Sequence, residues 1–321
     1  MKFFTITLVL ISLVFIISAQ QNPVVITLKN TETSIPEGIA VDLKTGDIYI
    51  TSINLHKIII AKKDGSYRDF IASGAEGFGE GLGIKIDEKR NRIWVASNKK
   101  EGNGFVSQVH VFDKSTGGVT NVFNHKDTLN HLFNDLVIDD DGNAWITATM
   151  SGKLFYADTK SDKLSIAMND TLIKYPNGIE LYKNKLYIAT YGSGLLVYDM
   201  EKKKLDKLKG YNNATYAFNL DGPGIYNNSL LAVYNTDSLN SNNAIIEYKL
   251  DKTGTAIVEE KIIQKGHPLF REPTTLAVAG NKLYVLANSN LGVYNANKES
   301  VAGVEQKLSP ITILVYDPGD M

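Results

Sequence analysis

The chain of 321 residues contains no cysteine. This absence excludes disulfide bonds, thiolate metal sites and cysteine nucleophiles, but it leaves the redox compartment open, because a protein without cysteine suits either environment. The sequence has no Gly-x-Ser-x-Gly motif and no other arrangement that indicates a serine triad. Lys and Arg number 34, and Asp and Glu 35, so the net charge is near zero and we expect no nucleic-acid partner.

Long hydrophobic runs are absent except at the N-terminus. Lys2 is followed by an almost wholly apolar stretch, residues 3–17, and then by the small residues Ser18 and Ala19. This order predicts a signal peptide over residues 1–20, and therefore a secreted protein, extracellular or periplasmic, with no membrane attachment after cleavage. The alternative is a membrane anchor, but the apolar run is short beside the roughly twenty residues that a bilayer span needs.

Sustained helical periodicity is scarce, and a repeat takes its place. Hydrophobic strands begin at the same phase at positions 37, 82, 134, 177, 221 and 274, at intervals of 43 to 53 residues. Intervals of this size are typical of propeller blades. The six starts read Glu37-Gly-Ile-Ala-Val-Asp, Leu82-Gly-Ile-Lys-Ile-Asp, Asn134-Asp-Leu-Val-Ile-Asp, Asn177-Gly-Ile-Glu-Leu-Tyr, Asp221-Gly-Pro-Gly-Ile-Tyr and Thr274-Thr-Leu-Ala-Val-Ala.

Each start is followed by a polar turn and a second strand, such as residues 48–51 and 186–189. A third strand often ends in an aromatic residue and an acid, and a weaker fourth strand follows in most repeats. This pattern predicts an all-β protein, a six-bladed β-propeller with four antiparallel strands per blade, as a single domain over residues 21–321. The spare strand at residues 24–28 is expected to close the last blade. An open solenoid is the alternative fold.

Four of the six starts carry an oxygen-bearing polar side chain: Glu37, Asn134, Asn177 and Asp221. Ring closure brings equivalent positions together around the axis, so these side chains are expected to point at one another. Two carboxylates and two amide carbonyls form a hard-cation site, which favours Ca²⁺, Mg²⁺ or Mn²⁺ over Zn²⁺ or Cu²⁺. The alternative is that Glu-Gly, Asn-Gly and Asp-Gly are ordinary turn dipeptides.

Other side chains could add to this site. His131 lies three residues before Asn134 and could reach the pocket, or it could be a loop histidine satisfied by backbone. Asp135 could act as a hydrogen-bond acceptor behind Asn134. The loops that follow the second strands are expected to rim the site and to take part in recognition, and the longest of them begin at Asn98 and Asn235.

At these residues the chain resembles the regucalcin and gluconolactonase family of six-bladed propellers, and the resemblance covers nearly the whole mature chain. In that family a Glu, the Asn of a Pro-Asn-Gly segment and the Asp of an Asp-Gly segment hold a divalent metal, and the Asn of Phe-Asn-Asp contacts substrate. The matching segments are Phe133-Asn134-Asp135 with Asp141-Gly142-Asn143-Ala144-Trp145, Tyr175-Pro176-Asn177-Gly178, and Leu220-Asp221-Gly222, together with Glu37.

The resemblance implies a metal-dependent hydrolase that acts on a lactone or related ester, with Ca²⁺ favoured as the ion. Asp221 and Asn134 would be the catalytic residues, and Glu37, Asn134, Asn177 and Asp221 the metal ligands. Asp221 would also serve as, or orient, the general base. The expected partner is a small-molecule substrate, although the rim loops could also bind a protein.

Three departures from the family pattern bear on the substrate. No Pro and Trp follow Glu37, and Leu132 stands where sugar-lactone members carry an Arg, which argues against sugar-acid lactones. The acidic doublets and histidine dyad of the similar paraoxonases are also missing. Two alternatives therefore stay open: a non-catalytic secreted propeller that binds a partner, with a structural metal or none, and a lyase or condensing enzyme similar to strictosidine synthase.

Overall fold

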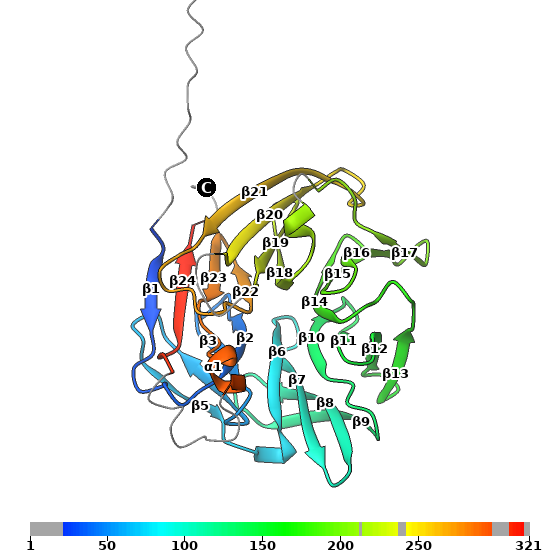
Figure 1. Ribbon diagram of the computed structural model, residues 1–321. Helices are drawn as coiled ribbons and strands as arrows, with labels where there is room; N and C mark the ends of the chain where they lie inside the picture. The colour runs from blue at the N-terminus through cyan, green and yellow to red at the C-terminus, as the bar shows by residue number, and fades with distance from the viewer. Residues whose placement is uncertain (1–21, 212–213, 237–241, 297–307, 318–321) are drawn as a thin grey trace, which may run out of the picture.

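The computed structural model describes residues 22–211, 214–236, 242–296 and 308–317, and in this part of the chain six four-stranded antiparallel sheets form a ring. Figure 1 shows the blades arranged in a ring around a common axis, and residues of the innermost strands line a cavity there; the region along this axis is called here the channel. The predicted all-β, six-bladed propeller is confirmed. The predicted signal peptide lies outside the described residues, and no described helix is both long and apolar enough to cross a membrane.

The six innermost strands are called here the first strands, and each contacts the first strands of the two neighbouring blades. Within each of the first five blades the strands follow one another in chain order from the channel outwards, and in the last blade β1 (Val24–Thr27) is the outermost strand. Blades one to three are β2 (Pro36–Val41), β3 (Ile48–Ser52), β4 (Lys57–Ala61) and β5 (Tyr67–Ile71); β6 (Glu80–Asp87), β7 (Arg92–Glu101), β8 (Gly104–Asp113) and β9 (Val119–Asp127); and β10 (Phe133–Ile138), β11 (Ala144–Ala148), β12 (Lys153–Asp158) and β13 (Lys163–Met168).

The last three blades follow the same plan, and three short helices lie between strands: η1 (Ala75–Gly77), η2 (Ala214–Ala217) and α1 (Leu291–Ala296). The strands of these blades are β14 (Pro176–Tyr182), β15 (Lys185–Thr190), β16 (Gly194–Asp199) and β17 (Lys204–Lys207); β18 (Leu220–Tyr226), β19 (Ser229–Tyr234), β20 (Ala244–Leu250) and β21 (Ile257–Lys265); and β22 (Leu276–Ala279), β23 (Lys282–Leu286) and β24 (Thr312–Tyr316), completed by β1 (Val24–Thr27).

The strand β1 closes the ring, as the sequence predicts. It pairs antiparallel with β24 in a register from Val24 opposite Val315 to Thr27 opposite Thr312. The last blade is thus built from both ends of the described chain. This arrangement ties the first and last blades together without a disulfide bond, which a chain without cysteine cannot form.

The core lies between neighbouring blades, where aromatic side chains of the second strands are buried. Trp94 of β7 stacks on Phe123 of its own blade at 5.9 Å between ring centroids, and it packs in one cluster with Phe133 and Leu136 of the next blade. Tyr187 of β15 similarly packs among residues of blade five. Such contacts fix the angle between adjacent blades, and therefore the positions of the first strands around the channel.

One predicted rim loop is a β-ribbon instead. The segment after Asn98 is expected to be a long loop, but β7 continues to Glu101 and pairs with β8, with Glu101 opposite Gly104. The two-residue turn is possible because Gly102 adopts a positive φ of 61°. Both faces of this extension are partly exposed, so its polar composition resembles that of a loop. The other long segment, after Asn235, falls partly on residues 237–241, outside the described part.

Replacement of Ile26 by Ala should destabilise the protein by about 2–5 kcal/mol, because the change leaves a cavity in a buried cluster that joins the first and last blades. Val24→Ala is the matched control on the same strand, since Val24 is 67% exposed and Ile26 is 3% exposed. Denaturant unfolding of both variants measures the difference. Equal midpoints would show that β1 does not contribute to closure through its buried face.

Candidate functional site at the channel mouth

The four predicted site residues occupy equivalent positions in four blades. Glu37, Asn134, Asn177 and Asp221 are each the second residue of a first strand, β2, β10, β14 and β18 respectively. They therefore lie at the same end of the channel, called here the channel mouth. Glu37, Asn177 and Asp221 are at most 8% exposed, whereas Asn134 is half-buried.

A β-bulge in the pairing between the first and second strands lies at or directly after each of these positions. The pairing register with the second strand shifts between Pro36 and Ile39, and comparable shifts interrupt β6, β10, β14 and β18. A bulge leaves backbone groups unpaired and changes the direction of a side chain. In two blades a threonine of the second strand accepts a hydrogen bond from an amide that the bulge leaves unpaired. Gly38 N donates to Thr51 Oγ1 at 2.8 Å, and Asp135 N donates to Thr147 Oγ1 at 2.9 Å.

The glycines after the site residues are required by close packing of the first strands. A Cβ on Gly38 would lie 2.2 Å from the Leu82 carbonyl oxygen, and a Cβ on Gly178 would lie 2.0 Å from Pro223 Cδ. Neither glycine has a positive φ. Glu37-Gly and Asn177-Gly are therefore strand segments at a narrow channel, and the alternative that they form turns is wrong.

Glu37 and Asp221 form a buried pair of carboxyl groups. Burial raises the pKa of Glu37 well above its ordinary value, and repulsion from Asp221 and Glu272 raises it further. Burial likewise raises the pKa of Asp221 to about 7, although its hydrogen bond from Gly222 N, at 2.7 Å, opposes that shift. Two carboxylates that repel one another out of contact with water are costly to ionise unless a positive charge lies between them.

Asn177 connects the pair to a tyrosine that the sequence analysis missed. Asn177 Nδ2 donates a hydrogen bond to the Tyr191 hydroxyl at 2.6 Å, and the Asn177 side chain also lowers the pKa of Asp221. The Tyr191 side chain is partly exposed, but desolvation of its hydroxyl and the nearby charges of Asp221 and Glu37 raise its pKa, so the phenol stays protonated. Tyr191 directly follows the second strand of blade four, in one of the loops expected to rim the site.

Two oxygens of this cluster are buried without a hydrogen-bond partner among the described residues: Glu37 Oε2 and Asn177 Oδ1. A buried acceptor without a donor costs about 1–3 kcal/mol, more if charged, so an orphan of this kind calls for an explanation. A bound divalent cation would satisfy both oxygens and compensate the Glu37–Asp221 repulsion. The all-oxygen donor set therefore fits an ion such as Ca²⁺.

Asn134 is less closely joined to the other three residues. Its Nδ2 donates to Thr149 Oγ1 at 3.1 Å, and Thr149 in turn donates to the Pro176 carbonyl oxygen at 2.6 Å. Asn134 is thus linked to the strand that carries Asn177 rather than directly to the carboxylates. At this position the Asn134 side chain could contact a bound substrate or act as a metal ligand.

Glu272 and Thr274 of blade six also belong to the cluster and were not predicted as site residues. The charge of Glu272 raises the pKa of Glu37, while the nearby Thr274 side chain lowers it. Thr274 Oγ1 also donates to the Glu37 carbonyl oxygen at 3.1 Å, across the junction between the last and first blades. Thr274 stands at the sixth repeat start, so its position in the repeat could have identified it as a site residue. No sequence signal pointed to Glu272.

Two neighbouring candidates have other roles. Asp135 accepts hydrogen bonds from Ile179 N at 3.0 Å and Leu136 N at 2.8 Å, so its carboxylate joins blades three and four. His131 is buried, but its ring contacts Asp127 and not the carboxylates of the channel mouth.

Deeper in the channel, Lys85 and Glu180 form an ion pair at 3.3 Å. Burial alone would lower the pKa of Lys85, but attraction to Glu180 and Asp135 outweighs burial and raises it. This pair lines a cavity of about 280 Å³. The cavity is lined by residues that come at least two positions after the site residues in the first strands, and Glu37, Asn177 and Asp221 are not among them. The cavity belongs to the opposite part of the channel.

Exposed apolar side chains occupy segments that adjoin the channel mouth. Tyr175 and Phe218 precede the first strands β14 and β18, and Met150 and Tyr191 follow the second strands β11 and β15. Antiparallel neighbours place the start of a first strand and the end of a second strand at the same edge of the sheet. The rim of the mouth is therefore partly apolar around a polar, acidic centre.

Fold and site together define a six-bladed β-propeller with a buried acidic cluster at one end of its channel. Solved structures with this fold include a gluconolactonase from Xanthomonas campestris (TM-score 0.57, 12% identity, 90% of this chain and 88% of that chain), virginiamycin B lyase from Staphylococcus aureus with quinupristin (0.56, 17%, 85% and 82%) and a glucose dehydrogenase (0.62, 15%, 92% and 99%). No family model matches the sequence, and no curated protein does.

These comparisons confirm the resemblance to the gluconolactonase type of six-bladed propeller at the level of the fold. Several of the similar structures are enzymes by name: a lactonase, lyases and a dehydrogenase. Because the identities are below 20% in these three, activity and ligands have to be argued from the residues of this chain.

Proposed function

We propose that this protein is a secreted, divalent-metal-dependent hydrolase that cleaves a lactone or related ester at the channel mouth. One observation carries the proposal: the buried Glu37–Asp221 pair, with Glu37 Oε2 and Asn177 Oδ1 buried and unpartnered beside it. A site of this kind stores electrostatic repulsion that a cation relieves. Perturbed carboxyl groups in a channel are also what acid–base catalysis requires.

Glu37, Asn177 and Asp221 would hold the ion, with Asn134 as the fourth ligand or as a contact to substrate. Ca²⁺ is favoured, because every donor is an oxygen and two of the four are charged. When bound, such an ion polarises a carbonyl group and stabilises negative charge on its oxygen.

Asp221 is the residue proposed to accept a proton from water during hydrolysis. Without an ion the pKa of Asp221 is about 7; a bound cation would lower that pKa and keep the carboxylate ionised, so that it could accept a proton. Its backbone bond to Gly222 N and its contact with Asn177 hold it in place. Tyr191, kept protonated by its surroundings, could donate a hydrogen bond to a substrate oxygen, while Asn134 orients the substrate from the neighbouring strand.

The apolar rim residues favour an ester or lactone with an alkyl or aryl group. Tyr175, Phe218 and Met150 are exposed beside the mouth, where an apolar substituent would contact them. Leu132 stands where sugar-lactone enzymes of the similar family carry an Arg, so the carboxylate of a sugar acid would have no cationic partner there. This difference also favours an apolar substrate. We therefore expect alkyl lactones and aryl esters to be better substrates than sugar-acid lactones.

A non-catalytic binding module is the second candidate, and the low exposure of Glu37, Asn177 and Asp221 favours it. A metal enclosed this well could serve only to brace the first strands against one another. In that case the apolar rim would contact a partner, and the ion would raise stability without supporting turnover.

The test is a Ca²⁺ titration of EDTA-treated protein by calorimetry, followed by assays of alkyl lactones, aryl esters and sugar-acid lactones with and without the ion. We expect binding of one Ca²⁺ at the mouth and turnover that EDTA abolishes. Binding of Ca²⁺ without turnover would favour the binding module. If the protein shows neither Ca²⁺ binding nor turnover, only the fold would be established.

Secretion is a separate part of the proposal and rests on the apolar N-terminal segment, residues 3–17, and the small residues after it. Expression of the full chain and N-terminal sequencing of the product should show a mature chain that begins near residue 21. An intact N-terminus on membrane-associated protein would favour the anchor instead.

A further inference from the structure

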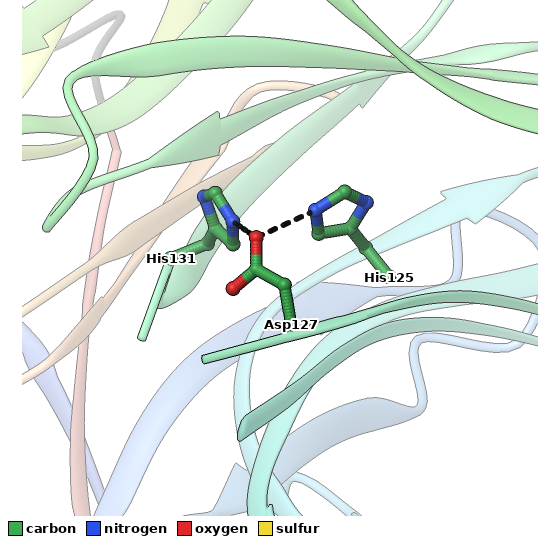
Figure 2. A group of neighbouring side chains, drawn as sticks. All are labelled: His125, Asp127 and His131. Carbon is green, nitrogen blue, oxygen red and sulfur yellow. Dashed lines mark hydrogen bonds and ion pairs between the residues drawn. The ribbon is translucent and has the colours of Figure 1, made fainter. Parts of the chain in front are cut away.

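A second group of potential metal ligands lies apart from the acidic cluster. His125 and Asp127 are at the end of β9, and His131 is in the connection to β10. Their ligand atoms all lie within 4.8 Å of one another. Figure 2 shows both imidazole rings directed at the same carboxylate oxygen, Asp127 Oδ2, which lies 2.8 Å from His131 Nε2 and 3.3 Å from His125 Nε2.

The local structure explains why these side chains meet. His125 and Asp127 are two residues apart on a strand, so they extend from the same face of β9. The chain then turns back toward the channel, and Leu129 N donates a hydrogen bond to Asp127 Oδ1 at 2.5 Å. That bond occupies one carboxylate oxygen and leaves the other, Oδ2, toward the two histidines. His131 arrives from the far side of the turn, just before β10 begins.

The group is held in place by packing. His131 is 3% exposed, and its ring lies 4.7 Å from the His125 ring between centroids. Both rings pack edge to face on Phe155, at 5.3 and 5.0 Å. His125 and Asp127 are 29% and 37% exposed, so the ligand atoms can be reached from solvent. A rigid base with an open side allows an ion to enter and to keep a water molecule.

The spacing of the donor atoms fits a small tetrahedral ion. Bonds of about 2.0–2.1 Å to imidazole nitrogen and carboxylate oxygen place two such ligands roughly 3.3 Å apart. The nitrogen–oxygen separations of 2.8 and 3.3 Å are close to that value, so an ion could bind with only small side-chain movements.

One ring nitrogen of His131 limits how tightly this group could hold an ion. Its Nδ1 is buried without a hydrogen-bond partner among the described residues. A protonated, cationic ring would therefore bury an unpaired N–H group. A metal-bound ring places its proton on the same nitrogen, so the missing acceptor limits affinity, but the ion's charge and bonds offset that cost. Loss of an outer acceptor typically weakens metal binding about 10–100-fold, which makes a tight structural site unexpected.

We propose that His125, Asp127 and His131 form a binding site for a divalent transition metal of the zinc class, separate from the oxygen-only site at the channel mouth. Two imidazoles and one carboxylate suit Zn²⁺, Cu²⁺, Ni²⁺ or Fe²⁺ and do not suit Ca²⁺. The site lies between blades two and three, on the same face of the ring as the channel mouth, because β10 begins there. Water or an exogenous ligand completes the coordination.

The test uses the full chain, stripped with EDTA and dialysed against Zn²⁺ in the presence of excess Ca²⁺, which competes for the oxygen-only site. Bound zinc is measured by mass spectrometry of the metal and by calorimetry. We expect one Zn²⁺ per chain, a rise in melting temperature with Zn²⁺, and visible absorption bands typical of tetrahedral coordination when Co²⁺ replaces Zn²⁺.

Two variants and one control make the assignment specific. His125→Ala removes a partly exposed ligand, and His131→Gln keeps a polar group in the buried position; each should weaken zinc binding at least about 100-fold while the circular dichroism spectrum is unchanged. The control is His56→Asn, because His56 is distant in sequence, makes no side-chain contact in the group and has a positive φ of 49° that Asn tolerates.

The outcome that overturns the proposal is wild-type protein that binds no zinc above background, which would make the group a hydrogen-bonded cluster only. Zinc binding that persists unchanged in both His125→Ala and His131→Gln would equally overturn it. Neither result depends on the proposed hydrolase, because the readout is metal binding in the presence of Ca²⁺ and not turnover.

Discussion

Asp221→Asn should lower hydrolysis of the best ester or lactone by about 10³-fold, within the range of about 10² to 10⁴ that a general base contributes. The variant keeps the size of the side chain but cannot accept a proton, and it also removes one of the two charges that would hold the ion. We expect it to fold normally, because the neutral amide relieves repulsion with Glu37. Initial rates and Ca²⁺ affinity, measured side by side, separate the two losses.

The matched control for that substitution is Asp206→Asn, on the exposed strand β17, where the carboxylate pairs with Lys204 at 2.8 Å. This control should keep wild-type rates. If Asp221→Asn retained turnover within tenfold of wild type, Asp221 would not be the general base. If the variant lost turnover but bound Ca²⁺ as before, its role would be in proton transfer rather than in ligation.

The second large effect is on stability as a function of pH in the absence of metal. The pKa of Asp221 is about 7 in the native state and 3.8 ordinarily, so the native state binds its proton more tightly than the unfolded state. Its contribution to stability is complete below pH 4 and is lost as the pH rises through 7. The shift of about 3 units corresponds to at most about 4 kcal/mol.

In EDTA, wild-type protein should therefore lose more stability between pH 5 and pH 8 than Asp221→Asn does. The difference between the two losses measures the contribution of the Asp221 carboxyl group, because the other titrating residues are the same in both proteins. Ca²⁺ should restore that stability, and its effect on the melting temperature should be larger at pH 8, where no proton has to be displaced. Identical pH profiles for wild type and variant would mean that the two carboxyl groups are not buried together.

The repeat made the fold and four positions of the site predictable. Each blade begins with the same short pattern, and a closed ring places equivalent positions at one end of the channel. Glu37, Asn177 and Asp221 are joined there by charge and hydrogen bonds. Asn134 is at the equivalent position, but its direct contact is Thr149.

Residues outside the repeat phase could not be found in the same way. Tyr191 follows a second strand, and Glu272 precedes the sixth repeat start, where it adopts a positive φ of 58°. Neither has an equivalent in the other blades that would draw attention to it. The ribbon of β7 and β8 was missed for a related reason, because its polar, partly exposed extension has the composition of a loop.

The sequence alone determined the number of blades, the strand that closes them and the polar residues at four of the six repeat starts, because these follow from a local pattern repeated along the chain. Only the tertiary structure decided which oxygens lie buried without partners, and that His125, Asp127 and His131 face one another across a turn. Those facts depend on bulges, on the close approach of neighbouring first strands and on burial, which arise when distant segments pack together.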